Sequence, residues 1–166
     1  LEVIPHAGTS PQTIEKSLLA AKLHGKTAIL VKDAPGFAVN RFFVPFLNEA
    51  ARMLEEGLAD IATIEEGGKR AFRIGMGPFQ LMNVTGIPIA VHAATTLGNE
   101  LGPFYAPAAP FLVEHGEADR PFAIDPDAAG IAGNDGVVQD RLRAATFLPI
   151  LQELDEGVAS AADIDT

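Results

Sequence analysis

Asn40 is the residue whose type and place best suit it to chemistry, at the end of the run Asp-Ala-Pro-Gly-Phe-Ala-Val-Asn over residues 33–40. The Pro35-Gly36 pair predicts a sharp turn, because proline fixes φ and glycine tolerates a positive φ. A helix that starts after such a turn presents free N–H groups and a partial positive charge, and an amide side chain in its first turn can donate to a ligand oxygen. The alternative interpretation is an ordinary connector whose Asn only helps to start the helix.

The elements on either side of this turn have to position Asn40. Residues 27–32 are typical of a strand, and a long helix is expected from Phe37 to Glu56, with Pro45 inside it and Gly57 at its end. Upstream, residues 1–4 favour a short strand, and Ser10-Pro11 predict the start of a helix that ends at Gly25. The prediction is a β-α-β unit followed by a long helix.

The remaining residues predict further helices and one linker. Thr63 to Glu66 have capping-box spacing, which predicts a helix toward Ile74. Shorter helices are expected over 79–84, 88–97 and 107–115, whereas Pro and Gly residues indicate a linker over 117–133. A last helix is expected from Asn134 or Asp135 to Gly157. Its apolar residues at helical spacing are Val138, Leu142, Ala145, Leu148 and Leu151.

An internal repeat relates the two long helices. Residues 41–64 align with residues 141–164 at a shift of about one hundred residues. The recurring positions are Leu54, Glu56, Gly57, Ala59, Ala62 and Ile64 with Leu154, Glu156, Gly157, Ala159, Ala162 and Ile164. Two amphipathic helices can agree by chance, but a shared Glu-Gly stop followed by the same Ala and Ile spacing favours duplication of one helical unit.

Composition limits the classes of function. A net charge of −10, with acidic residues spread along 166 residues, argues against a nucleic-acid partner. No apolar run approaches the roughly 18 residues of a membrane span, so no membrane partner is predicted. The absence of cysteine excludes disulfides, thiolate metal sites and a Cys nucleophile. No glycine fingerprint follows a strand and no metal-binding motif occurs, so no cofactor-binding or metal-ligating residue is predicted.

Several short motifs follow one another in a recognisable order. They are Leu1-Glu2-Val3-Ile4-Pro5, the Pro-Gly-Phe-Ala-Val-Asn-Arg run, and Gly77-Pro78-Phe79-Gln80-Leu81. Together they resemble the 3-hydroxyacyl-CoA dehydrogenase family, and the repeat favours its larger subtype with a duplicated domain. The resemblance implies a mainly α fold, in which a helical domain like the C-terminal domain of 6-phosphogluconate dehydrogenase follows a small β-α-β remnant of a Rossmann domain.

The resemblance also implies a division into domains. Residues 1–35 would end the NAD-binding domain, and residues 36–116 would form the helical domain. After the linker over 117–133, residues 134–166 would start a second copy of the helical domain. The family usually has Asp where this chain has Asn83, a residue that we expect to cap a helix.

The activity implied by the resemblance is the NAD-dependent oxidation of (S)-3-hydroxyacyl-CoA to 3-oxoacyl-CoA in fatty-acid β-oxidation. Asn40 matches the Asn that binds the substrate oxygen, and Glu2 matches the Glu that orients a catalytic His and balances its charge. Gly77, Pro78 and Phe79 match a loop near the acyl pocket. The His and most of the NAD site are expected upstream of Leu1, so this fragment alone should be inactive.

Two other functions stay open. One is a non-catalytic dimerisation and acyl-pocket module of a multidomain protein, and the other is a different β-hydroxyacid dehydrogenase with the same helical architecture. The expected partners are an acyl-CoA substrate and either a second subunit, in a homodimer, or the second helical repeat, by intramolecular packing. The expected location is cytoplasmic.

Overall fold

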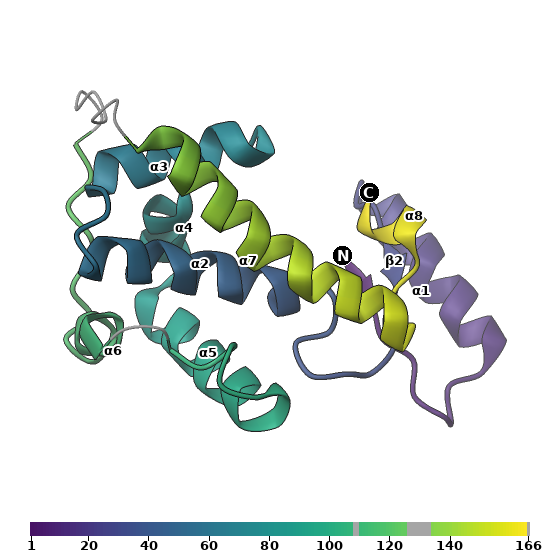
Figure 1. Cartoon of the computed structure of the whole chain (residues 1–166). Helices are drawn as coiled ribbons and strands as arrows, with labels where there is room; N and C mark the ends of the chain where they lie inside the picture. The colour runs from purple at the N-terminus through teal and green to yellow at the C-terminus, as the bar shows by residue number, and fades with distance from the viewer. Residues whose placement is uncertain (108–109, 126–133, 166) are drawn as a thin grey trace.

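The computed structural model describes residues 1–107, 110–125 and 134–165, most of them in helices (Figure 1). Two short parallel strands, β1 (Glu2–Val3) and β2 (Ile29–Leu30), are connected by α1 (Pro11–Leu23). The helices that follow are α2 (Val39–Glu55), α3 (Ile61–Phe72), α4 (Pro78–Thr85), α5 (Ile87–Leu101), α6 (Pro110–Glu117), α7 (Asp135–Glu156) and α8 (Ala161–Ile164). The predicted mainly α class with a small β-α-β unit is confirmed.

The β-α-β unit forms as its capping residues predict. Ser10 is the N-cap of α1 and its hydroxyl accepts the N–H of Thr13 at 3.2 Å, while Pro11 takes the first helical position. Gly25 follows the helix with a φ of +67°. The returning strand then places Ile29 opposite Glu2 and Leu30 opposite Val3. This register brings the end of β2, and hence the turn before α2, beside β1.

The helical body is organised around α2, which continues as one helix through Pro45. Its side chains Phe46, Ala50 and Met53 are buried in the largest apolar cluster, together with Phe79 of α4 and Leu142 of α7. Figure 1 shows α7 lying along α2 and α3. At its far end the chain returns to the β-α-β unit, where the N–H of Lys32 donates to the carbonyl of Val158 at 2.8 Å.

The repeated segments pack against each other in opposite directions. Arg41 near the start of α2 donates two bonds to Glu156 at the end of α7, at 2.6 and 2.5 Å. Arg141 near the start of α7 donates to Glu56 after the end of α2, at 2.5 Å. Arg41 and Glu56 of the first segment correspond to Arg141 and Glu156 of the second, so exchanging the segments turns one ion pair into the other. The two copies of the repeat are therefore related by a pseudo-twofold axis.

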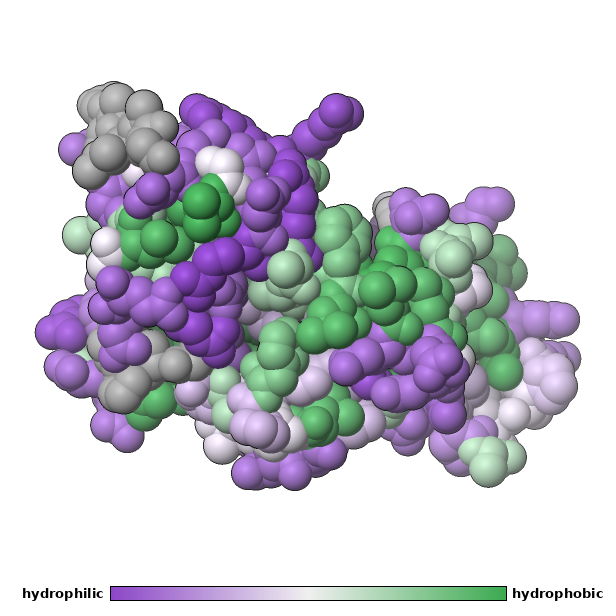
Figure 2. All heavy atoms as spheres, viewed as in Figure 1, coloured by the Kyte–Doolittle hydropathy of each residue, from purple (hydrophilic) through white to green (hydrophobic). Residues whose placement is uncertain are grey.

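The apolar residues that lie at helical spacing in α7 are not all buried. Val138, Leu142 and Ala145 are buried, but Leu148 and Leu151 are 46% and 63% exposed. The reason is that α7 faces α2 and α3 with its buried side, and these two leucines lie on the other side, where the described part of the chain does not cover them. Figure 2 shows apolar residues on this outer surface of α7.

Two capping predictions were wrong. Helix α3 begins at Ile61, because Asp60 is its N-cap and accepts the N–H of Thr63 at 2.8 Å, so Thr63 does not open the helix. Asn83 lies in the last turn of α4 and caps nothing. Its side-chain amide binds both the N–H and the carbonyl of Phe122 at 2.9 Å each. These bonds fix one part of the predicted linker, whose residues 126–133 lie outside the described residues.

Candidate functional site

The turn into α2 is close-packed and requires a glycine. Gly36 has a φ of +78°, and a Cβ at this position would lie 3.1 Å from the backbone nitrogen of Arg41 and 2.9 Å from Leu97. The N–H of Phe37 donates to the carbonyl of Ala34 at 2.9 Å and closes the turn. The Pro-Gly turn predicted from the sequence therefore sets the starting point of α2.

Glu2 caps α2 from the neighbouring strand. One oxygen of its carboxylate accepts the N–H of Ala38 at 2.8 Å and the N–H of Val39 at 3.2 Å. Ala38 is the N-cap residue and has no side chain that could accept these bonds. A carboxylate at this end also interacts favourably with the helix dipole. Sequence reasoning missed this bond, although an alanine before a helix indicates that its donors need an acceptor from elsewhere.

Asn40 lies in the first turn of α2, exposed at the edge of a cavity of about 340 Å³. Helices α2, α4 and α5 line this cavity. Its lining residues are Val39, Asn40, Phe43, Val44, Leu47, Leu81, Thr85, Ile89, Ala90 and Ala93. The Asn40 amide makes no hydrogen bond to any residue in the described part of the chain, so it is free to donate to a ligand. The cavity is thus apolar, with one free amide where α2 begins.

Glu2 and Asn40 face different spaces. Glu2 borders a second cavity, of about 310 Å³, between β1, the start of α2 and α8. Val39 borders both cavities. The structure therefore brings the two predicted residues to the same helical turn but does not bring them into one pocket. Their joint action on a substrate stays a prediction.

Gly77, Pro78 and Phe79 form the start of α4 rather than the wall of the Asn40 cavity. The buried carboxylate of Glu65 accepts the N–H groups of Phe79 and Gln80, the latter at 3.1 Å. Burial raises the pKa of Glu65. Phe79 is fully buried, and its ring centroid lies 4.7 Å from that of Phe122.

This arrangement gives the Gly-Pro-Phe motif an indirect connection to the cavity. The motif and Glu65 fix the first turn of α4, and Leu81 and Thr85 of the same helix line the Asn40 cavity. Glu65 was not identified from the sequence, where it was assigned to a capping box. Direct contact between the motif and a substrate stays a prediction.

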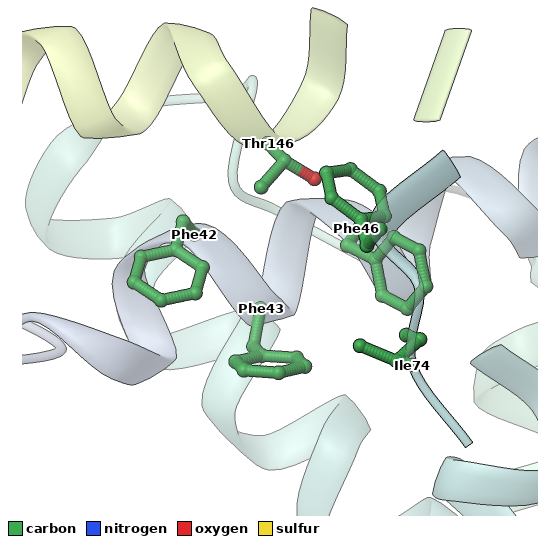
Figure 3. Close-up of a pocket in the computed structure, with 6 residues that line it drawn as sticks. Phe42, Phe43, Phe46, Ile74 and Thr146 are labelled. Atoms are coloured by element: carbon green, nitrogen blue, oxygen red, sulfur yellow. The ribbon is translucent and has the colours of Figure 1, made fainter. Parts of the chain in front are cut away.

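An aromatic cavity of about 180 Å³, shown in Figure 3, adjoins the Asn40 cavity. Phe42, Phe43 and Phe46 of α2 line it together with Phe72, Ile74 and Thr146. Phe43 borders both this cavity and the Asn40 cavity. The hydroxyl of Thr146 donates to the carbonyl of Leu142 at 2.9 Å, so it is already engaged. The lining offers apolar contacts, and no charged side chain contributes to it.

Two further searches cover only the described residues. No group of three or more His, Asp or Glu side chains there could hold a metal ion. None of the helices in the same ranges is long and apolar enough to cross a membrane. His115 stacks on Phe122, with a distance of 4.5 Å between the ring centroids, and its ring nitrogen contacts the carbonyl of Arg120 at 2.7 Å. His115 lines a different cavity from the one that Asn40 borders.

Comparison with known proteins places this chain in a family. The family model of the 3-hydroxyacyl-CoA dehydrogenase C-terminal domain matches residues 36–122. The alpha subunit of the fatty acid oxidation complex from Shewanella oneidensis is 33% identical over 176 residues, which cover 95% of this chain and 24% of that protein. The same subunit from Idiomarina loihiensis is 44% identical over 111 residues, or 65% of this chain and 15% of that protein. The chain thus spans a quarter or less of these relatives.

Solved structures agree with the sequence matches. (S)-3-hydroxybutyryl-CoA dehydrogenase from Ralstonia eutropha has a TM-score of 0.64 and 36% identity, covering 70% of this chain and 41% of that one. The 3-hydroxybutyryl-CoA dehydrogenase from Escherichia coli has a TM-score of 0.68 at 22% identity and shares the fold, covering 78% of this chain and 30% of that one. By its matched helical domain and its sequence relatives, this chain belongs to the 3-hydroxyacyl-CoA dehydrogenase family.

Proposed function

We propose that this chain is the helical part of an NAD-dependent 3-hydroxyacyl-CoA dehydrogenase, which oxidises (S)-3-hydroxyacyl-CoA to 3-oxoacyl-CoA in fatty-acid β-oxidation. The observation that carries this proposal is the free amide of Asn40 at the edge of an apolar cavity, within the segment that matches the family. In this arrangement the amide donates to the oxygen on C3 while the acyl chain occupies the apolar space.

The contribution of Asn40 is electrostatic. As the C3 hydroxyl becomes a carbonyl, its proton leaves to a base and negative charge develops on the oxygen. A donor fixed at the start of α2 stabilises that charge more than it stabilises the alcohol. The fixed turn at Gly36, together with the hydrogen bonds that Glu2 accepts from the N–H groups of Ala38 and Val39, keeps this donor in place before the substrate arrives.

NAD is the acceptor of the C3 hydride in this proposal, and it would bind outside the residues described here. The β1–α1 connection carries a single glycine, Gly8, at which an added Cβ would lie 2.9 Å from the His6 ring. A dinucleotide site needs a glycine-rich turn through which the pyrophosphate can approach the backbone. Among the described residues, the β1–α1 connection does not form such a turn. In the family the base is a His, and the resemblance matches none of the four histidines of this chain to it.

The second helical segment supports a proposal about assembly. We propose that residues 134–166 begin a second copy of the helical unit, because the reciprocal pairs Arg41–Glu156 and Arg141–Glu56 follow the sequence repeat. Of the two arrangements expected from the sequence, this pairing supports intramolecular packing. A homodimer and a cytoplasmic location stay predictions.

The test uses the full-length polypeptide that contains these residues. NADH formation from 3-hydroxybutyryl-CoA should be measured for the wild type, Asn40→Ala and the control Asn99→Ala, which removes an exposed amide of α5. Loss of the donor should lower kcat by more than roughly tenfold, as removal of a transition-state donor does, while the control keeps its rate. An Asn40→Ala variant with the kcat of the wild type would show that Asn40 only starts the helix.

A further inference from the structure

The residue after Asn40 is held entirely inside the protein. The side chain of Arg41 is 2% exposed, and its guanidinium donates from both terminal nitrogens to the two oxygens of Glu156. This paired geometry restricts both the position and the orientation of the guanidinium. Asn40 and Arg41 are consecutive, so the same helical turn directs one side chain to the cavity and the other to α7. Figure 1 shows α7 passing this end of α2 and continuing toward the β-α-β unit.

A second carboxyl group of α7 lies behind the pair. Glu153, one turn before Glu156, is fully buried, and neither of its oxygens has a hydrogen-bond partner among the described residues. The positive charge of Arg41 favours the ionised form of Glu153, whereas the negative charges of Glu2 and Glu156 disfavour it. The Nε atom of Arg41 is also without a hydrogen-bond partner in the described ranges. Glu156 is therefore the carboxylate that binds Arg41 directly, and the buried Tyr105 hydroxyl also interacts with the guanidinium.

The other end of the same interface carries a similar pair without a candidate site. Arg141 is bound by Glu56 and also by Glu49. Glu56 and Glu156 are almost equally exposed, at 46% and 48%. The two ends are not identical, because Arg141 has a second carboxylate partner in Glu49, whereas the ion pair of Arg41 is with Glu156. They differ in what lies next to them, because only the Arg41 end adjoins Asn40 and the N–H groups that Glu2 binds.

We propose that Glu156 is a positioning residue for the dehydrogenase site, acting through Arg41 to fix the first turn of α2 and with it the amide of Asn40. Because this role rests on the proposed function, it concerns the same reaction and adds a contribution from the second helical segment. The site then depends on a residue 115 positions further along the chain than Arg41.

Loss of Glu156 should affect the reaction more than substrate binding. The acyl chain contacts the apolar walls of α2, α4 and α5, which Glu156 does not touch. The Asn40 amide, in contrast, must meet an oxygen whose charge exists only in the transition state. A displacement of about 1 Å at such a donor is enough to reduce a rate by up to about a hundredfold. The expected signature is a lower kcat with little change in KM.

The test compares Glu156→Gln with the matched control Glu56→Gln in the full-length protein. Both changes remove one carboxylate charge from the α2–α7 interface, so both should lower the Tm. Only Glu156→Gln should lower kcat, by about tenfold, with KM for the acyl-CoA nearly unchanged. Glu156→Asp keeps the charge and should restore part of the lost kcat.

Hydrogen exchange gives a second readout that does not depend on activity. Glu156→Gln should speed exchange of the N–H groups of residues 38–41, whereas Glu56→Gln should leave them at the rate of the wild type. If Glu156→Gln fails to fold, Arg41→Lys replaces it, since lysine keeps the charge and loses the paired geometry.

The outcomes separate the two proposals. Equal kcat and equal exchange rates in the Glu156→Gln and Glu56→Gln variants would overturn the positioning role while leaving the dehydrogenase intact. A wild type without dehydrogenase activity would overturn the proposed function. In that case the exchange rates of residues 38–41 still decide whether Glu156 fixes the first turn of α2.

Discussion

The buried carboxyl group of Glu153 gives a prediction about stability that can be worked through in numbers. Burial raises the pKa of Glu153 to about 8 in the folded chain, from an ordinary value of 4.5. The folded state therefore holds a proton that the unfolded state releases above pH 4.5. Stability from this group is fully present below pH 4.5 and is lost as the pH rises through 8.

The size of the effect follows from the two pKa values. Their difference of 3.5, multiplied by about 1.4 kcal/mol for each pH unit, gives an upper value of about 5 kcal/mol. Between pH 5 and pH 8 the free energy of unfolding of the wild type should fall by roughly 3 to 4 kcal/mol because of Glu153. Glu153→Gln imitates the protonated form and does not titrate, so the wild type should lose stability relative to this variant over that range.

The assay is equilibrium unfolding in urea at pH values from 5 to 9 for the wild type, Glu153→Gln and the control Asp155→Asn. The control removes an exposed carboxyl from the same helix. Other carboxyl groups contribute equally to all three proteins, so the difference from the wild type isolates the mutated group. Free energies of unfolding that stay parallel for the wild type and Glu153→Gln from pH 5 to pH 8 would refute a neutral, buried Glu153.

Two further changes test contacts around α4 by thermal unfolding. Gly77→Ala should destabilise the chain by about 1 to 3 kcal/mol, because the added Cβ would lie 2.5 Å from the buried Glu65 carboxylate; a Tm equal to that of the wild type would contradict this packing. Asn83→Asp loses the donor to the Phe122 carbonyl and should cost about 1 to 3 kcal/mol at neutral pH. The cost should shrink in acid, where a protonated carboxyl can donate again. Asn99→Asp, at an exposed position of α5, serves as the control.

Local signals were sufficient for much of the fold. Ser10 and Pro11 predicted the start of α1, and the Pro35-Gly36 turn predicted the entry to α2. These features depend on residues that are near one another in the chain, and the reasons for them are steric. The capping box at Thr63 failed for a related reason. Asp60, three residues earlier, offers an equally good acceptor and has the extended backbone of an N-cap.

Contacts between distant residues were harder to predict. Arg41, Glu56, Arg141 and Glu156 all fall inside the aligned repeat, but alignment alone does not say that α2 and α7 run in opposite directions. Only that direction converts the repeat into crossed ion pairs. The exposure of Leu148 and Leu151 has the same origin, because helical spacing cannot say which face of α7 meets a neighbour. The candidate site shows this limit too, since the capping of α2 by Glu2 spans 36 residues.

The long separation between Arg41 and Glu156 has a consequence for biosynthesis. A ribosome adding about 5 to 20 residues per second completes α2 on the order of 10 s before it reaches Glu156. During that interval the Arg41 guanidinium lacks the carboxylate that binds it in the folded chain, and the face of α2 that meets α7 is open to solvent. The first helical unit can therefore reach its final form only after the second long helix has been synthesised. The ion pair between Arg41 and Glu156, next to the turn that carries Asn40, can form only after α7 has been synthesised.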